Sequence, residues 1–142
     1  MSTRKQLGTQ IAYVMQEVIA SAVLTNERIA RTVGLNVVDF QTFGVLLRTG
    51  PMTPGQVAAA TELPSSTTTR VLDRLEGKGM VRREADPSDR RKVWVHAVPL
   101  DDDRVNSAYA EIVGQLDQAH ATFTVAELET VLRYLDTIKN VR

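Results

Sequence analysis

Residues 65–74 concentrate side chains that can bind phosphate and nucleobase edges. Five consecutive hydroxyls run from Ser65 to Thr69, and Arg70 and Arg74 follow one helical turn apart. Short hydroxyl side chains are mediocre helix formers, so helix propensity does not explain five in succession. At a helix N-terminus they can bind phosphate and reach bases, and arginine can bind guanine in a bidentate manner. A solvated helix with weak surface ion pairs would also explain these residues, so this segment alone leaves two interpretations open.

A second basic group follows at residues 86–92 and favours the nucleic-acid interpretation. Asp-Pro-Ser-Asp is typical of a turn, and Arg90, Arg91 and Lys92 come directly after it. The flanking segments 80–84 and 93–98 are predicted to be β-strands, and in the second Val93, Val95 and Ala97 alternate with Trp94, His96 and Val98. The three cations therefore lie on the tip of a hairpin, where their mutual repulsion would be relieved by a polyanionic partner.

The charge distribution supports the same partner, although the whole chain is formally neutral. Residues 70–92 hold eight Lys or Arg against five Asp or Glu, a local surplus of three, and the remaining chain holds nine against twelve. Sequence-specific binding to nucleic acid requires a basic patch on the surface and does not require a positive net charge of the whole chain.

The elements that position these groups are predicted from apolar spacing and capping residues. Thr53, Pro54 and Gln56 form a capping box with proline at the first helical position, which predicts a short helix to about residue 60. A brief connection at 61–63 leads to a second short helix that Gly79 ends. Such a pair is a helix-turn-helix, and its predicted core residues are Val57, Ala58, Leu63, Val71 and Leu75.

The segments on either side of this lobe are predicted to be longer helices. Residues 4–32 form the first, which Gly34 ends, and Asn36 caps another over Val37–Arg48. After the hairpin, Asp101–Asp103 place negative charge at the start of a helix with apolar residues at heptad spacing, which we prefer to a cation site. Thr124 and Glu127 form the capping box of a last helix.

The run from Arg70 to Val95 resembles the MarR family of winged helix-turn-helix regulators. Leu75, Glu76 and Gly79 match the Leu-Glu-x-x-Gly pattern at the end of that family's recognition helix. Asp89 and Arg91 match the Asp-x-Arg pattern of its wing, and the resemblance extends over nearly the whole chain.

The sequence departs from the family pattern at Pro64, where the family usually has serine or a similar residue. Proline suits the first turn of a helix but supplies no capping oxygen. The cap is therefore expected to move to Ser65 or to be weaker in this chain.

The fold that we expect is mainly α with a small β-hairpin wing, in one domain of 1–142. A winged helix-turn-helix lobe takes up about 37–98, and about 4–32 and 101–141 form a helical dimerisation region. The terminal helices have no lobe of their own to pack on, so we predict a two-fold homodimer. Two recognition helices would then lie in successive major grooves roughly 34 Å apart, and the expected DNA-binding residues are Ser65, Ser66, Thr67, Thr69, Arg70, Arg74, Asp89, Arg90 and Arg91.

The resemblance also implies the mechanism that we expect. The chain would be a repressor that binds a pseudo-palindromic operator in double-stranded DNA, with Arg91 inserted in the minor groove and Asp89 holding it. Family members commonly bind small aromatic or anionic effectors that release DNA. The sequence separates no effector pocket from the core, so no effector residues are assigned.

Other classes of function are less well supported by composition. With no cysteine and only two histidines, His96 and His120, the sequence offers no evident nucleophile with a base and no metal or cofactor site, so we expect no enzyme. No apolar run approaches the roughly 20 residues needed to span a bilayer, and the N-terminus has no signal-peptide core, which predicts a cytoplasmic protein. A winged-helix protein-interaction module and a DNA-binding protein without an effector remain alternatives.

Overall fold

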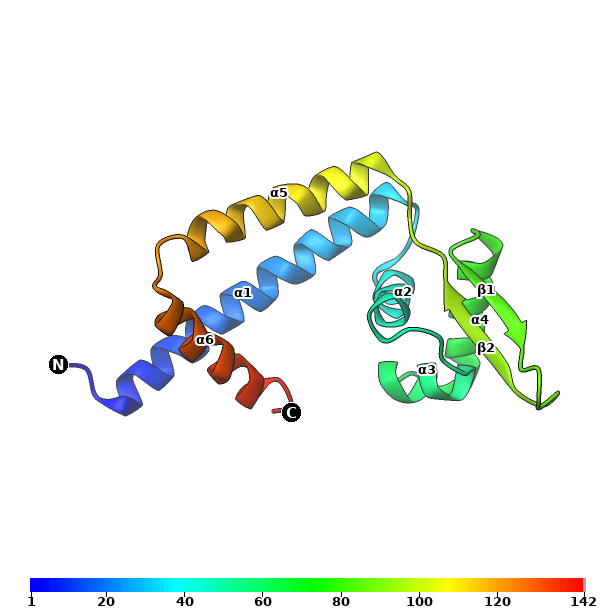
Figure 1. The fold of residues 1–142 in the computed structure, drawn as a ribbon, viewed down its shortest axis with the longest axis horizontal. Helices are drawn as coiled ribbons and strands as arrows, with labels where there is room; N and C mark the ends of the chain where they lie inside the picture. The colour runs from blue at the N-terminus through cyan, green and yellow to red at the C-terminus, as the bar shows by residue number, and fades with distance from the viewer. Residues whose placement is uncertain (142) are drawn as a thin grey trace. The chain divides into compact units, whose positions relative to one another are not determined.

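The computed structural model describes residues 1–141, which form six helices and one antiparallel hairpin (Figure 1). The fold is mainly α with a small β-hairpin wing, as the sequence predicts. By internal contacts the chain divides into two compact units, Met1–Asp101 and a second that begins at Asp102. The elements are α1 (Arg4–Thr32), α2 (Val37–Thr49), α3 (Pro54–Thr61), α4 (Ser65–Gly77), β1 (Val81–Ala85), β2 (Val93–Ala97), α5 (Asp103–His120) and α6 (Val125–Ile138).

Side-chain caps fix where most of these helices begin. The predicted capping boxes are present at Thr53 with Gln56 and at Thr124 with Glu127, and Asn36 caps α2 by accepting from the backbone N–H of Asp39. In each case a side-chain oxygen satisfies an N–H that has no partner within the helix. A further capping box, between Thr3 and Gln6, begins α1.

The start of α4 differs from these caps because Pro64 occupies the N-cap position. No side chain caps this helix, which confirms the expectation that its cap is weaker and not the expectation that Ser65 takes over as the cap. At the other end the backbone of Gly79 has φ 71°, a left-handed conformation that glycine adopts at little cost. It follows that α4 ends sharply and passes at once into β1.

The core of the first unit lies between α2, α3, α4 and the hairpin, which cluster together in Figure 1. Its fully buried side chains include the predicted Val57, Val71 and Leu75, whereas Ala58 and Leu63 are only partly buried. Further buried apolar residues are Phe43, Leu46, Leu72, Val81 and Val95. The apolar stripe of α4 thus faces inward, as its spacing predicts.

The hairpin pairs β1 with β2 in antiparallel register, with Arg83 opposite Val95. Met52, which lies before α3, adds a bridge to the free edge of β2 by two backbone hydrogen bonds with Val95, of 2.8 and 3.1 Å. The sequence gives no sign of this bridge, because a single paired residue has no periodicity. The bridge joins the wing to the segment that leads into α3.

Helix α1 is more apolar than the sequence analysis expected. By length and composition alone this helix could cross a membrane, so the expectation that no run is long enough was wrong. Between Lys5 and Glu27 the only charged residue of this helix is Glu17, which keeps its hydropathy high. Apolar side chains on different sides of the helix, such as Val18 and Leu24, are exposed, and only Ile29 and Ala30 near its C-terminus are buried.

The second unit consists of α5 and α6 and also exposes apolar side chains. Asp102 caps α5 by accepting from the backbone N–H of Arg104, so this acidic run serves the start of the helix, as we preferred. The hydrogen bond and the positive charge of the Arg104 side chain lower the pKa of Asp102 to about 2. Exposed apolar residues of this unit include Tyr109, Val113, Leu116, Phe123, Leu132 and Leu135.

Candidate nucleic-acid interface

The N-terminal half of α4 presents most of the predicted hydroxyls to solvent. Ser65, Ser66 and Thr69 are exposed and Thr67 is partly exposed. Thr68, which the sequence analysis placed on the outward face with the others, is buried and donates to the Pro64 carbonyl at 3.1 Å. The reason is its spacing, since it lies three and four positions before the buried pair at 71 and 72.

Arg70 and Arg74 lie one turn apart on α4 but have different surroundings. Within residues 1–141 the Arg70 guanidinium makes no ion pair, and the residue is exposed. The Arg74 guanidinium donates Nε to Oδ2 of Asp39 at 2.8 Å and Nη2 to Oδ1 at 2.7 Å. This hydrogen bond and the charge of Asp39 raise the pKa of Arg74. A bidentate arginine–carboxylate pair is among the stronger charge-assisted hydrogen bonds.

Arg83 on β1 connects the hairpin to α4. Its guanidinium donates to Asp73 at 2.8 Å and to Glu76 at 3.0 Å, both on the exposed side of the helix. Burial lowers the pKa of Arg83, but the hydrogen bonds and charges of the two carboxylates outweigh it, and the net shift is upward. Because one cation bridges two acids on α4, helix α4 and strand β1 are held together.

The wing tip is organised by Asp86, which the sequence analysis treated only as a turn residue. Its Oδ2 accepts from the Trp94 indole at 2.8 Å, and its Oδ1 accepts from the Ser88 hydroxyl and from the backbone N–H groups of Ser88 and Asp89. The indole hydrogen bond and the bonds from Ser88 hold the Asp86 pKa well below its usual range. A carboxylate followed two residues later by serine is the signal of such a turn.

Asp89, Arg90 and Arg91 lie together at this tip, and all three are exposed. Asp89 accepts from the backbone N–H of Arg91 at 3.0 Å, so it constrains the backbone of that residue. Within the described part of the chain, neither the Arg90 nor the Arg91 guanidinium forms an ion pair. Lys92, the third cation of the run, lies over the Trp94 ring, with Nζ 4.9 Å from the ring centroid.

The predicted site residues therefore belong to one compact unit in two groups. One group lies on the first turns of α4 and the other on the wing tip, and Arg83 links the elements that carry them. A helix that offers hydroxyls and an arginine, beside a hairpin that offers two more arginines, can bind phosphates and groove edges of duplex DNA.

Comparison with known proteins shows what the chain resembles. A model of the MarR family matches residues 33–92, which include α2, α3, α4, β1 and the wing tip. Among its relatives, the HTH-type transcriptional regulator YcgE of Bacillus subtilis is 26% identical over 134 residues, 94% of this chain and 87% of the relative. The B. subtilis regulator MhqR is 25% identical over 105 residues, 74% and 72% of the two chains.

Solved structures of MarR-family proteins have the same fold as this chain. A MarR family protein from Bacillus stearothermophilus superposes with a TM-score of 0.73 at 19% identity, over 97% of this chain and 96% of that one. Apo MarR from E. coli superposes with a TM-score of 0.61 at 20% identity, over 89% and 94% of the two chains. The winged helix-turn-helix architecture predicted from the sequence is confirmed.

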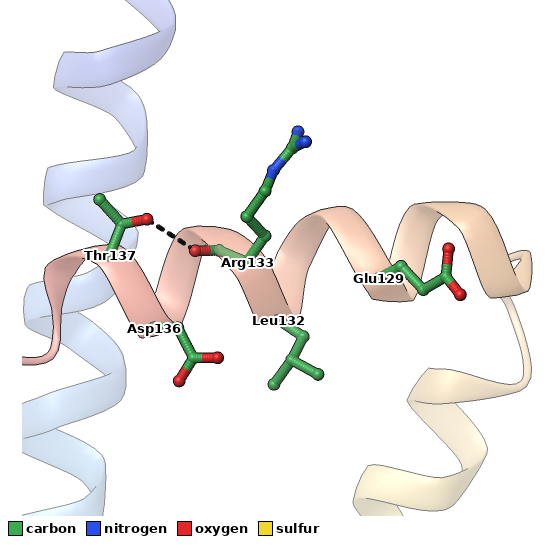
Figure 2. Close-up of a pocket in the computed structure, with 5 residues that line it drawn as sticks. All are labelled: Glu129, Leu132, Arg133, Asp136 and Thr137. Atoms are coloured by element: carbon green, nitrogen blue, oxygen red, sulfur yellow. Dashed lines mark hydrogen bonds between the residues drawn. The ribbon is translucent and has the colours of Figure 1, made fainter.

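Helix α6 carries an open depression, which Figure 2 shows in close-up. Its lining residues all come from this one helix: Glu129, Leu132, Arg133, Asp136 and Thr137. Leu132 and Asp136 project from one side of α6 and Arg133 from the other, so the side chains do not converge on a ligand (Figure 2). The hydroxyl of Thr137 donates to the Arg133 carbonyl of the same helix at 2.8 Å. This surface is not a built binding site.

No three His, Cys, Asp or Glu side chains within residues 1–141 lie close enough together to hold a metal ion.

Proposed function

We propose that this chain is a MarR-family regulator, a repressor that binds a pseudo-palindromic operator as a homodimer. In each chain α4 enters the major groove and the wing lies beside the flanking minor groove. The observation that carries the proposal is the set of exposed guanidinium groups of Arg70, Arg90 and Arg91, which make no ion pair within the described chain. Phosphate and base edges are the partners that such groups bind with geometric specificity.

The roles of the individual residues follow from their positions. Ser65, Ser66, Thr67 and Thr69 divide between phosphate and base contacts at the start of α4, where free N–H groups add to phosphate binding. Arg91 enters the minor groove, where narrow regions have enhanced negative potential, and Arg90 binds the neighbouring backbone. Asp89 fixes the backbone from which Arg91 projects.

The homodimer is supported by the apolar side chains that a single chain leaves in water. Val14, Val18 and Ile19 on α1 are 57%, 62% and 57% exposed, and Leu132 on α6 is 62% exposed. A helix that is apolar on most of its circumference is stable only when it is buried. A second copy related by a two-fold axis would cover these faces and repeat the recognition helices at the spacing of one DNA turn.

Effector release and a cytoplasmic location complete the proposal. A small aromatic or anionic molecule would release DNA only if it bound one spacing of the recognition helices more tightly than the other. A cytoplasmic protein has direct access to chromosomal DNA. Screening aromatic carboxylates and phenols for release of bound operator tests the effector, and a library without any releasing compound would favour an effector-free regulator.

The DNA-binding proposal is tested by selecting duplexes from a random-sequence pool with the wild-type chain. We expect enrichment of an inverted repeat whose half-sites lie about ten base pairs apart, because two symmetry-related helices must reach successive major grooves. Enrichment of no sequence would contradict the proposal and favour a winged-helix module that binds protein.

A further inference from the structure

We infer that Arg74 is a positioning residue: its ion pair with Asp39 sets the recognition helix at the angle needed to read DNA, and Arg74 is not a DNA contact. This inference rests on the proposed function. It separates Arg74 from Arg70, with which the sequence pattern groups it.

The pair has the geometry of a fixed joint between two helices. Both Asp39 oxygens are bound by one guanidinium, at 2.7 and 2.8 Å, in a fork that allows little rotation. The Asp39 side chain is only 2% exposed, whereas that of Arg74 is 46% exposed. The carboxylate is therefore part of the core of the first unit, and the arginine reaches it from the surface of α4.

The place of Asp39 on α2 explains why a carboxylate is stable there. Asp39 is the third residue of α2, and its backbone N–H donates to the Asn36 cap at 2.8 Å. Negative charge is favoured in the first turn of a helix. The joint therefore ties α4 to the beginning of α2, the point where the chain has just left α1.

A second contact ties α4 to the same corner. Lys78, the C-cap residue of α4, donates its Nζ to the Gly34 carbonyl at 3.0 Å, in the connection between α1 and α2. Gly34 has φ 70°, and Leu35 beside it is buried. Two cations one turn apart, Arg74 and Lys78, thus hold the C-terminal half of α4 on the α1–α2 corner, while Arg83 holds the same helix to the wing.

The same geometry argues against a DNA contact by Arg74. Two of its five N–H donors are used by Asp39, and its charge is neutralised by the carboxylate less than 3 Å away. A neutralised pair adds little attraction for phosphate. Turning the guanidinium toward DNA would leave a buried carboxylate without its partner, which is strongly unfavourable.

The test measures operator affinity across a salt series for Asp39→Asn, Arg74→Gln and the double variant, using the duplex selected by the wild-type chain. We expect each single variant to lose about tenfold in affinity, the effect of losing one charge-assisted joint. The double variant should lose no more than the singles, because both remove the same contact. The slope of log affinity against log salt should stay at its wild-type value in all three.

Arg70→Gln is the matched control, an arginine on the same helix without an ion pair. Its salt slope should fall by about 0.9, the change for one phosphate contact. If Arg74 bound DNA, Arg74→Gln would show that same fall, and Asp39→Asn would raise affinity by freeing a cation. Either result would overturn the inference.

Urea unfolding of the wild type, Asp39→Asn, Arg74→Gln and the double variant provides a test that needs no DNA. The effects of the two single substitutions on the free energy of unfolding should be strongly non-additive, and additive effects would overturn the inference. A wild-type chain that selects no DNA sequence would instead contradict the proposed function. The two failures are therefore distinguishable.

Discussion

At the scale of single residues, the eight cations of residues 70–92 divide by what they bind within the chain. Arg74, Arg82 and Arg83 pair with carboxylates, Lys78 binds a carbonyl, and Lys92 lies over an indole. Within the described residues, the remaining three, Arg70, Arg90 and Arg91, have no such partner. Among the cations of residues 70–92, internal pairing thus leaves those of the first turns of α4 and of the wing tip available.

Replacing Arg91 by alanine should weaken operator binding by roughly tenfold and lower the salt slope by about one, because one minor-groove cation is lost. Its side chain is exposed and has no ion pair in the described chain, so stability should not change. Fluorescence anisotropy measures the affinity for the operator, and sedimentation measures whether the variant still forms the dimer. Arg31→Ala, an exposed arginine of α1, is the control. Equal affinity of Arg91→Ala and wild type would reject this role.

The wing tip should show a pH dependence that originates at Asp86. The pKa of Asp86 is depressed in the folded chain. The ionised carboxylate therefore stabilises the folded chain fully above its ordinary pKa of 3.8, and this stabilisation is lost as the pH falls through the folded-state pKa. The difference in Tm between wild type and Asp86→Asn should therefore be constant above about pH 5 and should shrink below about pH 4. Differential scanning calorimetry measures it.

Trp94→Phe is the companion variant, because it removes the largest cause of the Asp86 shift while keeping an aromatic ring. The Tm of this variant should depend less on pH between 4 and 2 than the wild-type Tm, in the range where both chains remain folded. If the difference in Tm between the wild type and Trp94→Phe were the same at pH 3 and pH 7, Asp86 would not be the source of the pH dependence.

Sequence patterns identify which residues of the interface are polar, but not which of them are already engaged. Arg70 and Arg74 have the same residue type and lie on the same face of one helix. The partner of Arg74 lies 35 positions earlier, and no local pattern predicts a contact over that separation. Burial of Thr68, by contrast, is implied by its spacing from Val71 and Leu72, and a stricter use of periodicity would have found it.

At the scale of elements, caps and turns determine where α3 and α4 begin and end. Thr53 with Gln56 begins α3, Pro64 begins α4 without a side-chain cap, and Gly79 ends the turn after α4. The capping box of α3 was read correctly from the sequence because it satisfies backbone groups within four residues. The weak start of α4 was read correctly because proline has no capping oxygen. The Met52 bridge and the Asp39–Arg74 pair could not be read, because they join segments far apart in the chain.

Removing the α3 cap tests this description. Thr53→Ala should lower the free energy of unfolding by about 1 kcal/mol, the usual effect of losing an N-cap hydroxyl. Thr130→Ala is the control, because that hydroxyl bonds a carbonyl of its own helix on an exposed surface and its loss should change stability little. Urea unfolding measures both. Equal effects of the two substitutions would show that the capping box does not stabilise α3.

At the scale of the whole molecule, the apolar faces of α1, α5 and α6 are the main feature that one chain does not explain. Leu7, Val18 and Leu24 on α1 and Val113 and Leu116 on α5 are all exposed by about 45% or more. Soluble monomers rarely expose such extended apolar surface. The heptad spacing of apolar residues on α5 was predicted from the sequence.

A charge placed on this surface should prevent assembly. Val18→Asp leaves the core of the chain intact, because Val18 is 62% exposed, but it would bury a carboxylate in the proposed dimer. Sedimentation equilibrium should give twice the 15.7 kDa chain mass for wild type and a single chain mass for the variant. Gln41→Asp, at an exposed position of α2, should sediment as wild type. A wild-type monomer at micromolar concentration would contradict the dimer.

Sequence-specific DNA binding is tested most directly by fluorescence anisotropy of the purified chain on labelled DNA from upstream of its own gene. The titration is repeated with scrambled competitor and across a salt series. The predicted result is tight binding that resists the competitor and whose logarithm falls steeply with log salt, because several phosphates are neutralised. Weak binding that is indifferent to sequence, both on this DNA and on duplexes selected from a random pool, would contradict it.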